Sequence, residues 1–217
     1  MHINIVNRNI NRLFFSSLFF VLLISIEPTY AQDDGSKFTN FAGFDLGTVT
    51  LSEIEQKYGH ATLIESGDAG EYEAKICYSL DDGILYFLSG ELGGDIHELL
   101  GFAVSVQRIS EQKKCAEFPV KKKPFKLNLA GLHLGMSKAE FEKVFTTKVK
   151  WNGNTGTIFF ESKRAMKQKE LKRLPKDVQE GTKAGVFQNY FDVIVSIDGY
   201  FEGNKLVEFR VWKTETL

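Results

Sequence analysis

The segment "GELGGDIHE" (90–98) brings together side chains that could carry out acid–base chemistry. Glu91, Asp95, His97 and Glu98 lie close together in a stretch rich in glycine. Carboxylates beside a histidine can exchange protons with a substrate or hold a metal ion. One hypothesis is therefore a small envelope hydrolase or metal-dependent enzyme that uses the Glu91–Glu98 loop. The alternative is a polar hairpin loop with flexible glycines.

The rest of the sequence does not strengthen the catalytic hypothesis. His60, His97 and His133 follow the N-terminal segment, and none has the spacing of a zinc-binding motif. The sequence also lacks a nucleophile elbow, a phosphate-binding loop and an EF-hand loop. We therefore predict no catalytic residue, no metal ligand and no cofactor.

A second chemically distinctive segment is "KRAMKQKELKRLPK" (163–176), which is strongly basic. Such a segment could bind an acidic protein, the phosphates of a lipopolysaccharide or an anionic membrane surface. Nucleic acid is not expected, because the aromatic side chains on which bases stack are absent from this segment. The alternative is a solvated basic helix, which could also dock on the acidic first half of the same chain. The predicted binding residues are Lys163, Arg164, Lys167, Lys169, Lys172 and Arg173.

The charges of the chain are divided unequally between its two halves. Residues 32–118 contain 16 acidic and 6 basic residues, whereas residues 119–217 contain 11 acidic and 19 basic residues. This asymmetry bears on partners and electrostatic steering, and not on the fold. It is also consistent with mutual attraction between the halves.

The first 31 residues have the order of a secretory signal peptide. A polar segment with Arg8 and Arg12 precedes an apolar run from Leu13 to Ile26, and small residues follow Pro28. The apolar run is shorter than the roughly 20 residues that span a bilayer. We expect cleavage after about Ala31, a mature chain that does not span the membrane, and a periplasmic or secreted location.

The two cysteines, Cys77 and Cys115, both follow the predicted cleavage site. An isolated pair in an exported chain indicates a disulfide bond. A reactive thiol is the alternative, but neither an adjacent histidine nor a CxxC spacing supports it.

An internal similarity indicates how these segments are organised. "NFAGFDLGTVTLSEIEQKYG" (40–59) and "NLAGLHLGMSKAEFEKVF" (128–145) share asparagine, alanine, glycine and leucine positions. The shared glycines predict tight turns that orient the segment that follows. Each then contains an S/T-x-x-E capping box, Thr50 with Glu53 and Ser137 with Glu140, followed by apolar residues at helical spacing. Each helix is followed by alternating apolar segments and turn residues, which predict antiparallel strands.

The predicted fold class is α+β, with two tandem units that each pack a capped helix on an antiparallel β-sheet. The expected segments are a signal peptide (1–31), a first repeat with the disulfide (32–118), a linker (119–125) and a second repeat (126–217). The basic segment belongs to an insertion in the second repeat, at about 162–190.

The repeated pattern resembles that of β-lactamase-inhibitor-type proteins, through Gly131, Leu134, Gly135, Met136, Ser137, Glu140, Phe141 and Phe145. It is also similar to the small outer-membrane-assembly lipoproteins of the SmpA/OmlA group. The tandem arrangement favours the inhibitor-like version, and the lipid-attachment cysteine of the lipoproteins is absent. The resemblance implies a protein-binding sheet surface.

The functional prediction is an exported, non-catalytic binding module of the envelope or secreted fraction. Its partner would be a protein bound through a sheet face, and an anionic surface is the second partner class. The remaining alternatives are the envelope enzyme described above and an outer-membrane assembly factor.

Overall fold

The computed structural model describes residues 35–80, 83–106, 114–119 and 128–217. The expected signal peptide (1–31) lies outside the described residues, as does nearly all of the expected linker (119–125). From Asp33 to Leu217 the chain forms one compact unit. None of the helices in the described ranges is long and apolar enough to cross a membrane.

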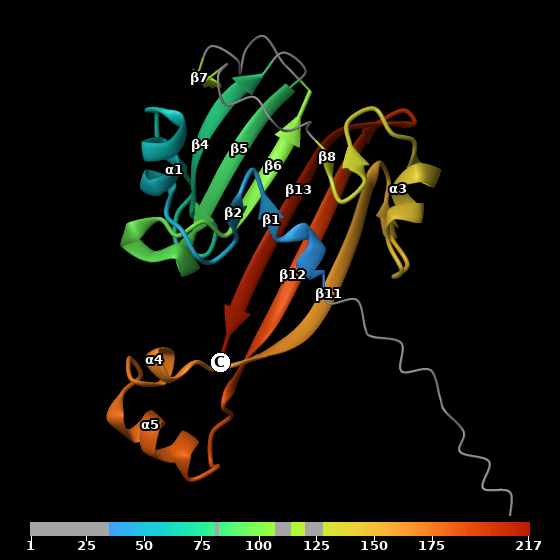
Figure 1. The fold of residues 1–217 in the computed structure, drawn as a ribbon. Coiled ribbons are helices and arrows are strands. Elements are labelled where there is room, and N and C mark those ends of the chain that lie inside the picture. Colours follow the sequence, from blue (N-terminus) through green and yellow to red (C-terminus); the bar gives the residue numbers. More distant parts are fainter. Residues whose placement is uncertain (1–34, 81–82, 107–113, 120–127) are drawn as a thin grey trace, which may run out of the picture. The chain divides into compact units, whose positions relative to one another are not determined.

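One large, mainly antiparallel sheet dominates this unit (Figure 1). Its main strands follow the order β10-β11-β12-β13-β6-β5-β4-β3, and the short β7 pairs in parallel with β4. The strands are β3 (Ile64–Ser66), β4 (Glu73–Leu80), β5 (Gly83–Gly90), β6 (Gly101–Ser105), β7 (Ala116–Glu117), β10 (Lys150–Asn152), β11 (Thr155–Ala165), β12 (Tyr190–Glu202) and β13 (Lys205–Thr216).

The sheet is continuous across the two halves of the chain. β6 and β13 pair in antiparallel register from Gly101↔Trp212 to Ser105↔Glu208. The predicted combination of helices with antiparallel strands is confirmed. The separate sheets expected from the sequence are instead joined edge to edge, because the last strand of each half leaves one edge available for pairing.

Two short hairpins precede the two main helices. They are β1 (Asn40–Phe41) with β2 (Phe44–Asp45), and β8 (Asn128–Leu129) with β9 (Leu132–His133). Their turn residues all have positive φ, at 56° and 78° for Ala42 and Gly43 and at 48° and 99° for Ala130 and Gly131. Two successive residues of positive φ make the turn that best matches the twist of a hairpin. The sequence predicts the tight turns but not the strands beside them.

The helices α1 (Leu51–Tyr58) and α3 (Lys138–Val144) both begin with the predicted capping box. Thr50 accepts a hydrogen bond from the Glu53 amide, and the Glu53 carboxylate accepts one from the Thr50 amide at 2.7 Å. Ser137 and Glu140 repeat both bonds, the second also at 2.7 Å. These bonds satisfy amides that would otherwise lack partners in the first turn.

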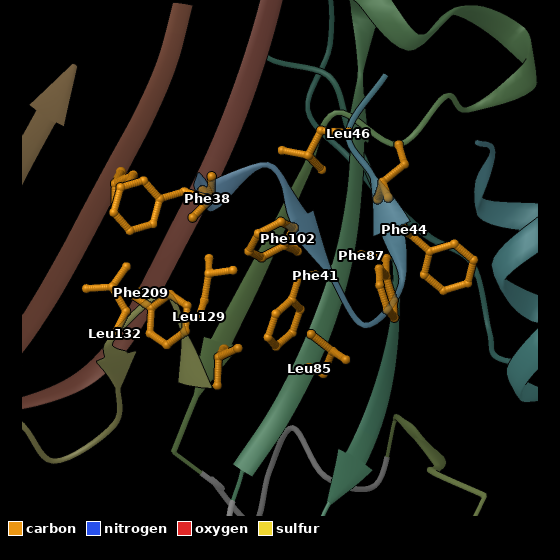
Figure 2. Close-up of a cluster of buried hydrophobic side chains, with 14 of the residues drawn as sticks. Phe38, Phe41, Phe44, Leu46, Leu85, Phe87, Phe102, Leu129, Leu132 and Phe209 are labelled. Carbon is orange, nitrogen blue, oxygen red and sulfur yellow. The ribbon is translucent and has the colours of Figure 1, made fainter. Parts of the chain in front are cut away.

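The hairpins and helices cover one face of the sheet and enclose its hydrophobic core. Alternate residues of the strands point into this core, as Ile76 and Tyr78 do on β4 and Phe209 and Val211 do on β13. Figure 2 shows phenylalanine and leucine side chains of the hairpins against those of the sheet. The opposite face of the sheet is therefore lined by the intervening residues.

The remaining helices are short and lie outside the sheet. They are η1 (Ser36–Phe38), η2 (Glu91–Ile96), α4 (Gln168–Leu171) and α5 (Lys176–Lys183). The insertion predicted at 162–190 is shorter than expected. β11 and β12 remain paired as far as Ala165↔Tyr190, so Ser162, Lys163 and Arg164 belong to a strand.

Candidate functional site

The candidate site is the face of the sheet that is opposite the helices, here called the open face. One row of directly opposed residues crosses it through seven strands. The row begins at Phe159 on β11, which is 46% exposed. In order it contains Phe159, Ser196, Trp212, Gly101, Leu88, Lys75 and Ile64. The other exposed apolar side chains of this face are Ile194 and Tyr200, both on β12.

The indole of Trp212 occupies the space left by two glycines of the neighbouring strands. A Cβ on Gly101 would lie 2.4 Å from the Trp212 ring, and one on Gly90 would lie 3.2 Å from it. Any larger residue at Gly101 would displace the ring, so the glycine allows the indole to lie across the sheet. Trp212 is half-buried there and presents the rest of its surface to solvent.

The next row of the open face combines charged and polar residues with the buried Ala103 and Cys77. It contains Thr157, Asp198, Arg210, Ala103, Tyr86 and Cys77. Arg210 extends from β13 to Glu73 on β4 and donates a hydrogen bond of 2.9 Å to that carboxylate. Lys75 donates to the other oxygen of Glu73, also at 2.9 Å. Burial would raise the pKa of Glu73, but these two cations outweigh it and lower the pKa.

Beside this charged group the open face contains a cavity of about 370 Å³. Its lining includes three cations and one carboxylate, beside the apolar surfaces of Ile64, Tyr86 and Leu88. The charged residues are Lys75, Lys114, Arg210 and Glu208. The Nε atom of Arg210 is buried and has no hydrogen-bond partner among the described residues. A volume of this size, with an apolar wall and a few polar groups, is typical of a binding pocket. An acidic group of a partner would find donors there.

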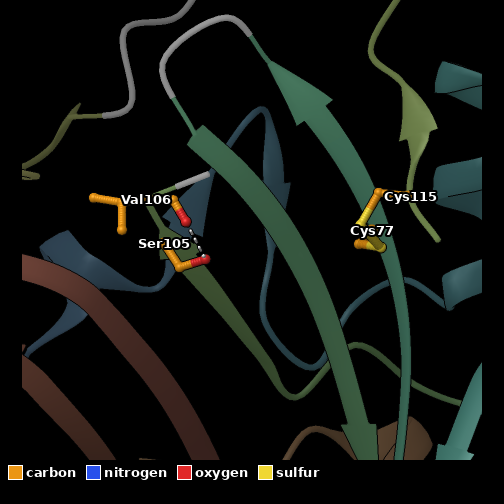
Figure 3. Close-up of a disulfide and its surroundings, with 4 residues drawn as sticks. All are labelled: Cys77, Ser105, Val106 and Cys115. Atoms are coloured by element: carbon orange, nitrogen blue, oxygen red, sulfur yellow. Dashed lines mark hydrogen bonds between the residues drawn. A yellow bond between two sulfur atoms is a disulfide. The ribbon is translucent and has the colours of Figure 1, made fainter. Parts of the chain in front are cut away.

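The predicted disulfide between Cys77 and Cys115 is present and lies on the same face (Figure 3). Cys77 lies on β4, and Cys115 directly precedes β7. The amide of Phe118 also donates to the carbonyl of Ser79 at 3.0 Å. The bond and the β4–β7 pairing hold residues 114–119 against β4, and both cysteines contribute to the wall of the cavity.

The structure separates the predicted basic residues into two groups. Lys163 and Arg164 lie on β11. Lys163 donates to the Tyr190 hydroxyl, whereas Arg164 is paired with Glu215 and Glu170, and its pKa is raised chiefly by the hydrogen bond to Glu215. The second group is exposed and forms no ion pair within the described ranges; it consists of Lys167, Lys169, Lys172 and Arg173.

The Glu91–Glu98 loop was the site of the alternative enzyme hypothesis. Residues 91–96 form η2, and the Glu91 carboxylate accepts a hydrogen bond from the Gly70 amide. The His97 ring lies beside that of Tyr72, and its buried Nδ1 has no hydrogen-bond partner in the part of the chain that the structure describes. No group of three or more histidine, cysteine or acidic residues in the described part of the chain is arranged to hold a metal ion.

Sequence reasoning did not identify Trp212, Arg210 or Tyr200 as members of one surface. The alternation of Val207, Phe209 and Val211 assigns the intervening residues to the other face of their strand, and this signal could have identified Arg210 and Trp212. It does not show which strand lies beside β13. The pairing of β6 with β13 creates the surface, and it joins residues more than a hundred positions apart.

Comparisons with known proteins give little information about this chain. A scan against protein-family models and a search of curated proteins found no match. A search of solved structures found a crystal structure from Streptococcus mutans described as a "putative beta-lactamase inhibitor protein". It is 12% identical, the match covers 84% of this chain and 91% of that chain, and the TM-score is 0.24. At this TM-score the likeness supports no argument about fold or function.

Proposed function

We propose that this chain is a non-catalytic module that binds another protein through the open face of its sheet. The observation that carries the proposal is the combination of exposed aromatic side chains with a cation-lined cavity on that one face. Tryptophan, tyrosine and arginine contribute most of the binding energy in many protein interfaces. Here Trp212, Tyr200 and Arg210 lie on adjacent strands, with Phe159 beyond them.

The proposal is tested by identifying the partner and then weakening the open face. The purified chain is used to capture proteins from the envelope and the medium of the producing cells, and the dissociation constant of a captured protein is measured. We expect Trp212→Ala and Phe159→Ala each to weaken binding about tenfold or more, as loss of a central aromatic side chain usually does. Capture of outer-membrane proteins would instead favour the assembly-factor alternative.

The matched controls are Leu92→Ala and Ile96→Ala, which remove exposed apolar side chains outside the strands, at 60% and 67% exposure. They should leave the dissociation constant within about threefold of the original, because isolated exposed residues contribute little. If Trp212→Ala and Phe159→Ala behave like these controls, the open face is not the binding surface.

We also infer that the two halves of the chain are an internal repeat. Each half has a hairpin, a capped helix and a run of antiparallel strands, in the same order. Corresponding residues also make corresponding hydrogen bonds. The Gly47 amide donates to the Leu99 carbonyl, and the Gly135 amide donates to the Leu206 carbonyl. The proposal would place β6 and β13 as corresponding strands, paired with each other about an approximate twofold axis.

Export to the periplasm or the medium completes the proposal. The disulfide supports it, because such bonds persist in oxidising compartments. Residues 1–31 would be the signal peptide, cleaved after about Ala31.

The exposed basic residues of the insertion are proposed as a second contact, one that steers an anionic partner surface toward the module. Lys167, Lys169, Lys172 and Arg173 are exposed, and the apolar Val186 and Phe187 of the same insertion are 73% and 49% exposed. Cations without ion pairs attract an anionic surface at long range, and salt screens this attraction. No ion pair joins this group to the acidic half within the described ranges, which favours an external partner over internal docking.

Replacing these four residues with glutamine should reduce binding to anionic lipid vesicles about tenfold or more at low salt, since each basic residue contributes about 1 kcal/mol near such a surface. Binding is measured by vesicle sedimentation at several salt concentrations, beside the melting temperature. A control with the same charge change replaces Lys37, Lys143, Lys148 and Lys205. A loss of several degrees in melting temperature with unchanged binding would show that the group stabilises the fold instead.

A further inference from the structure

The strand β11 has an edge that, along most of its length, no strand of the described residues covers. It pairs with β12 from Thr155↔Tyr200 to Ala165↔Tyr190, whereas β10 covers its other side only from Thr155 to Thr157. Figure 1 shows β11 on the outer side of the β12–β13 pair. In the ranges that the structure describes, no backbone pairs with the outer side of Ile158–Ala165. A row of unpaired amides and carbonyls is a template for another strand.

Proline and a β-bulge, two of the features that protect such an edge, are absent from this segment, and its charged residues are Glu161, Lys163 and Arg164. Ile158–Ala165 contains neither proline nor glycine, and its register with β12 is uninterrupted. The segment is longer than an average strand of five or six residues. Phe159, on its open-face side, is 46% exposed. The segment can therefore accept a strand of substantial length.

The sequence of the edge indicates which strand it accepts. Antiparallel pairing with a second copy, about a twofold axis perpendicular to the sheet, keeps the two open faces on the same side. Directly opposed side chains must lie on the same face of the sheet. The axis must therefore pass midway between one residue and the same residue of the second copy. Registers centred on Glu161 and on Ser162 cover the longest stretch of the free edge, and shifting the centre to Phe160 or Lys163 shortens the overlap.

Charge distinguishes these two registers. Centred on Glu161, the pairing would place Glu161 directly opposite the partner's Glu161, and directly opposed like charges are destabilising. Centred on Ser162, it places Glu161 opposite the partner's Lys163, and the twofold axis repeats this ion pair. The same register places the exposed ring of Phe159 opposite the partner's Ala165, where a small side chain leaves room for it. The edge is thus complementary to itself in one register.

We propose that two copies of this chain associate by antiparallel pairing of their β11 strands, centred on Ser162. The two sheets become one sheet, with both open faces on the same side. This inference does not depend on the proposed function, because binding through the open face requires no second copy.

The test measures the association of the purified protein by sedimentation equilibrium. The unchanged protein should dimerise. Glu161→Lys and Lys163→Glu should each raise the dimer dissociation constant at least about tenfold, because each places two like-charge pairs at the centre. The double exchange, Glu161→Lys with Lys163→Glu, should restore the original dissociation constant. Because Lys163 also contacts Tyr190, this restoration separates loss of pairing from local disruption of the fold.

Cross-linking tests the register independently. The chain has two cysteines, both in the internal disulfide, so an introduced cysteine is the only free thiol. In this register the Ser162 Cα atoms of the two copies lie about 5 Å apart, within the range of a disulfide. Ser162→Cys should form a covalent dimer on oxidation. Phe159→Cys is the control, because its two copies are offset by six residues, or about 20 Å.

Three results would overturn the proposal. The first is a protein that remains monomeric up to about 1 mM, the weak end of specific association. The second is a dimer that neither charge reversal weakens, and the third is a Ser162→Cys variant that cross-links no faster than Phe159→Cys. Pairing of the same edge with a peptide of another protein would produce the first result.

Discussion

Replacing Phe209 with alanine should lower the free energy of unfolding by about 3–5 kcal/mol, the usual cost of removing a buried phenylalanine ring. Phe209 is fully buried on β13, opposite Gly199 of β12 and Val104 of β6. It therefore lies where the strands of the two halves meet, and Figure 2 shows it in the same cluster as Leu129 and Leu132 of the second hairpin. The neighbouring strands are held by their own pairing and cannot move in to fill the space that the missing ring leaves.

Urea denaturation followed by tryptophan fluorescence measures this effect. Phe159→Ala is the matched control, since it removes the same ring from the same sheet but from the open face. That change should alter the free energy of unfolding by less than about 1 kcal/mol. Equal losses for the two variants would contradict the assignment of one buried face and one open face.

Loss of the disulfide should have an effect of similar size. Cys77 and Cys115 are 38 positions apart, and in the chain-entropy model a closed loop of that length stabilises the folded state by about 4 kcal/mol. We expect the double variant Cys77→Ala, Cys115→Ala to lose about this amount. The segment around Cys115 would then still contact β4 through the two-residue β7, the Phe118 hydrogen bond and the packing of the Phe118 ring on Tyr78.

Reduction of the unchanged protein separates the bond from the packing of its side chains. Dithiothreitol should destabilise the unchanged protein to about the level of the double variant, and the double variant should not respond to it. An unfolding midpoint in urea that is the same with and without reductant would show that the bond does not constrain the unfolded chain.

The parts of the fold that the sequence predicted depend on residues close together in the chain. The capping boxes at Thr50 and Ser137 were predicted correctly because each is completed within three residues. The turns at Gly43 and Gly131 were predicted for the same reason, since positive φ is a local property. The short strands beside those turns were missed, because two residues are too few to show alternation.

The candidate site was predicted only in part. The disulfide pair and the exposed basic residues of the insertion were identified from residue type and spacing. The family resemblance implied a protein-binding sheet face, but it did not indicate which residues form that face. Lys163 and Arg164 were assigned to the insertion, because a run of basic residues does not show where β11 ends.

By itself, the sequence determined where the two capped helices begin, which side of a long strand is apolar, and which two cysteines can pair. The tertiary structure decided that β6 pairs with β13, that the indole of Trp212 lies on Gly101, and that Arg210 reaches Glu73, a residue 137 positions away. These contacts depend on which edges remain free once the strands of each half have paired. Closing the long loops between these residues lowers the entropy of the chain, and packing over the whole core has to offset that loss. A local sequence pattern does not show whether it does.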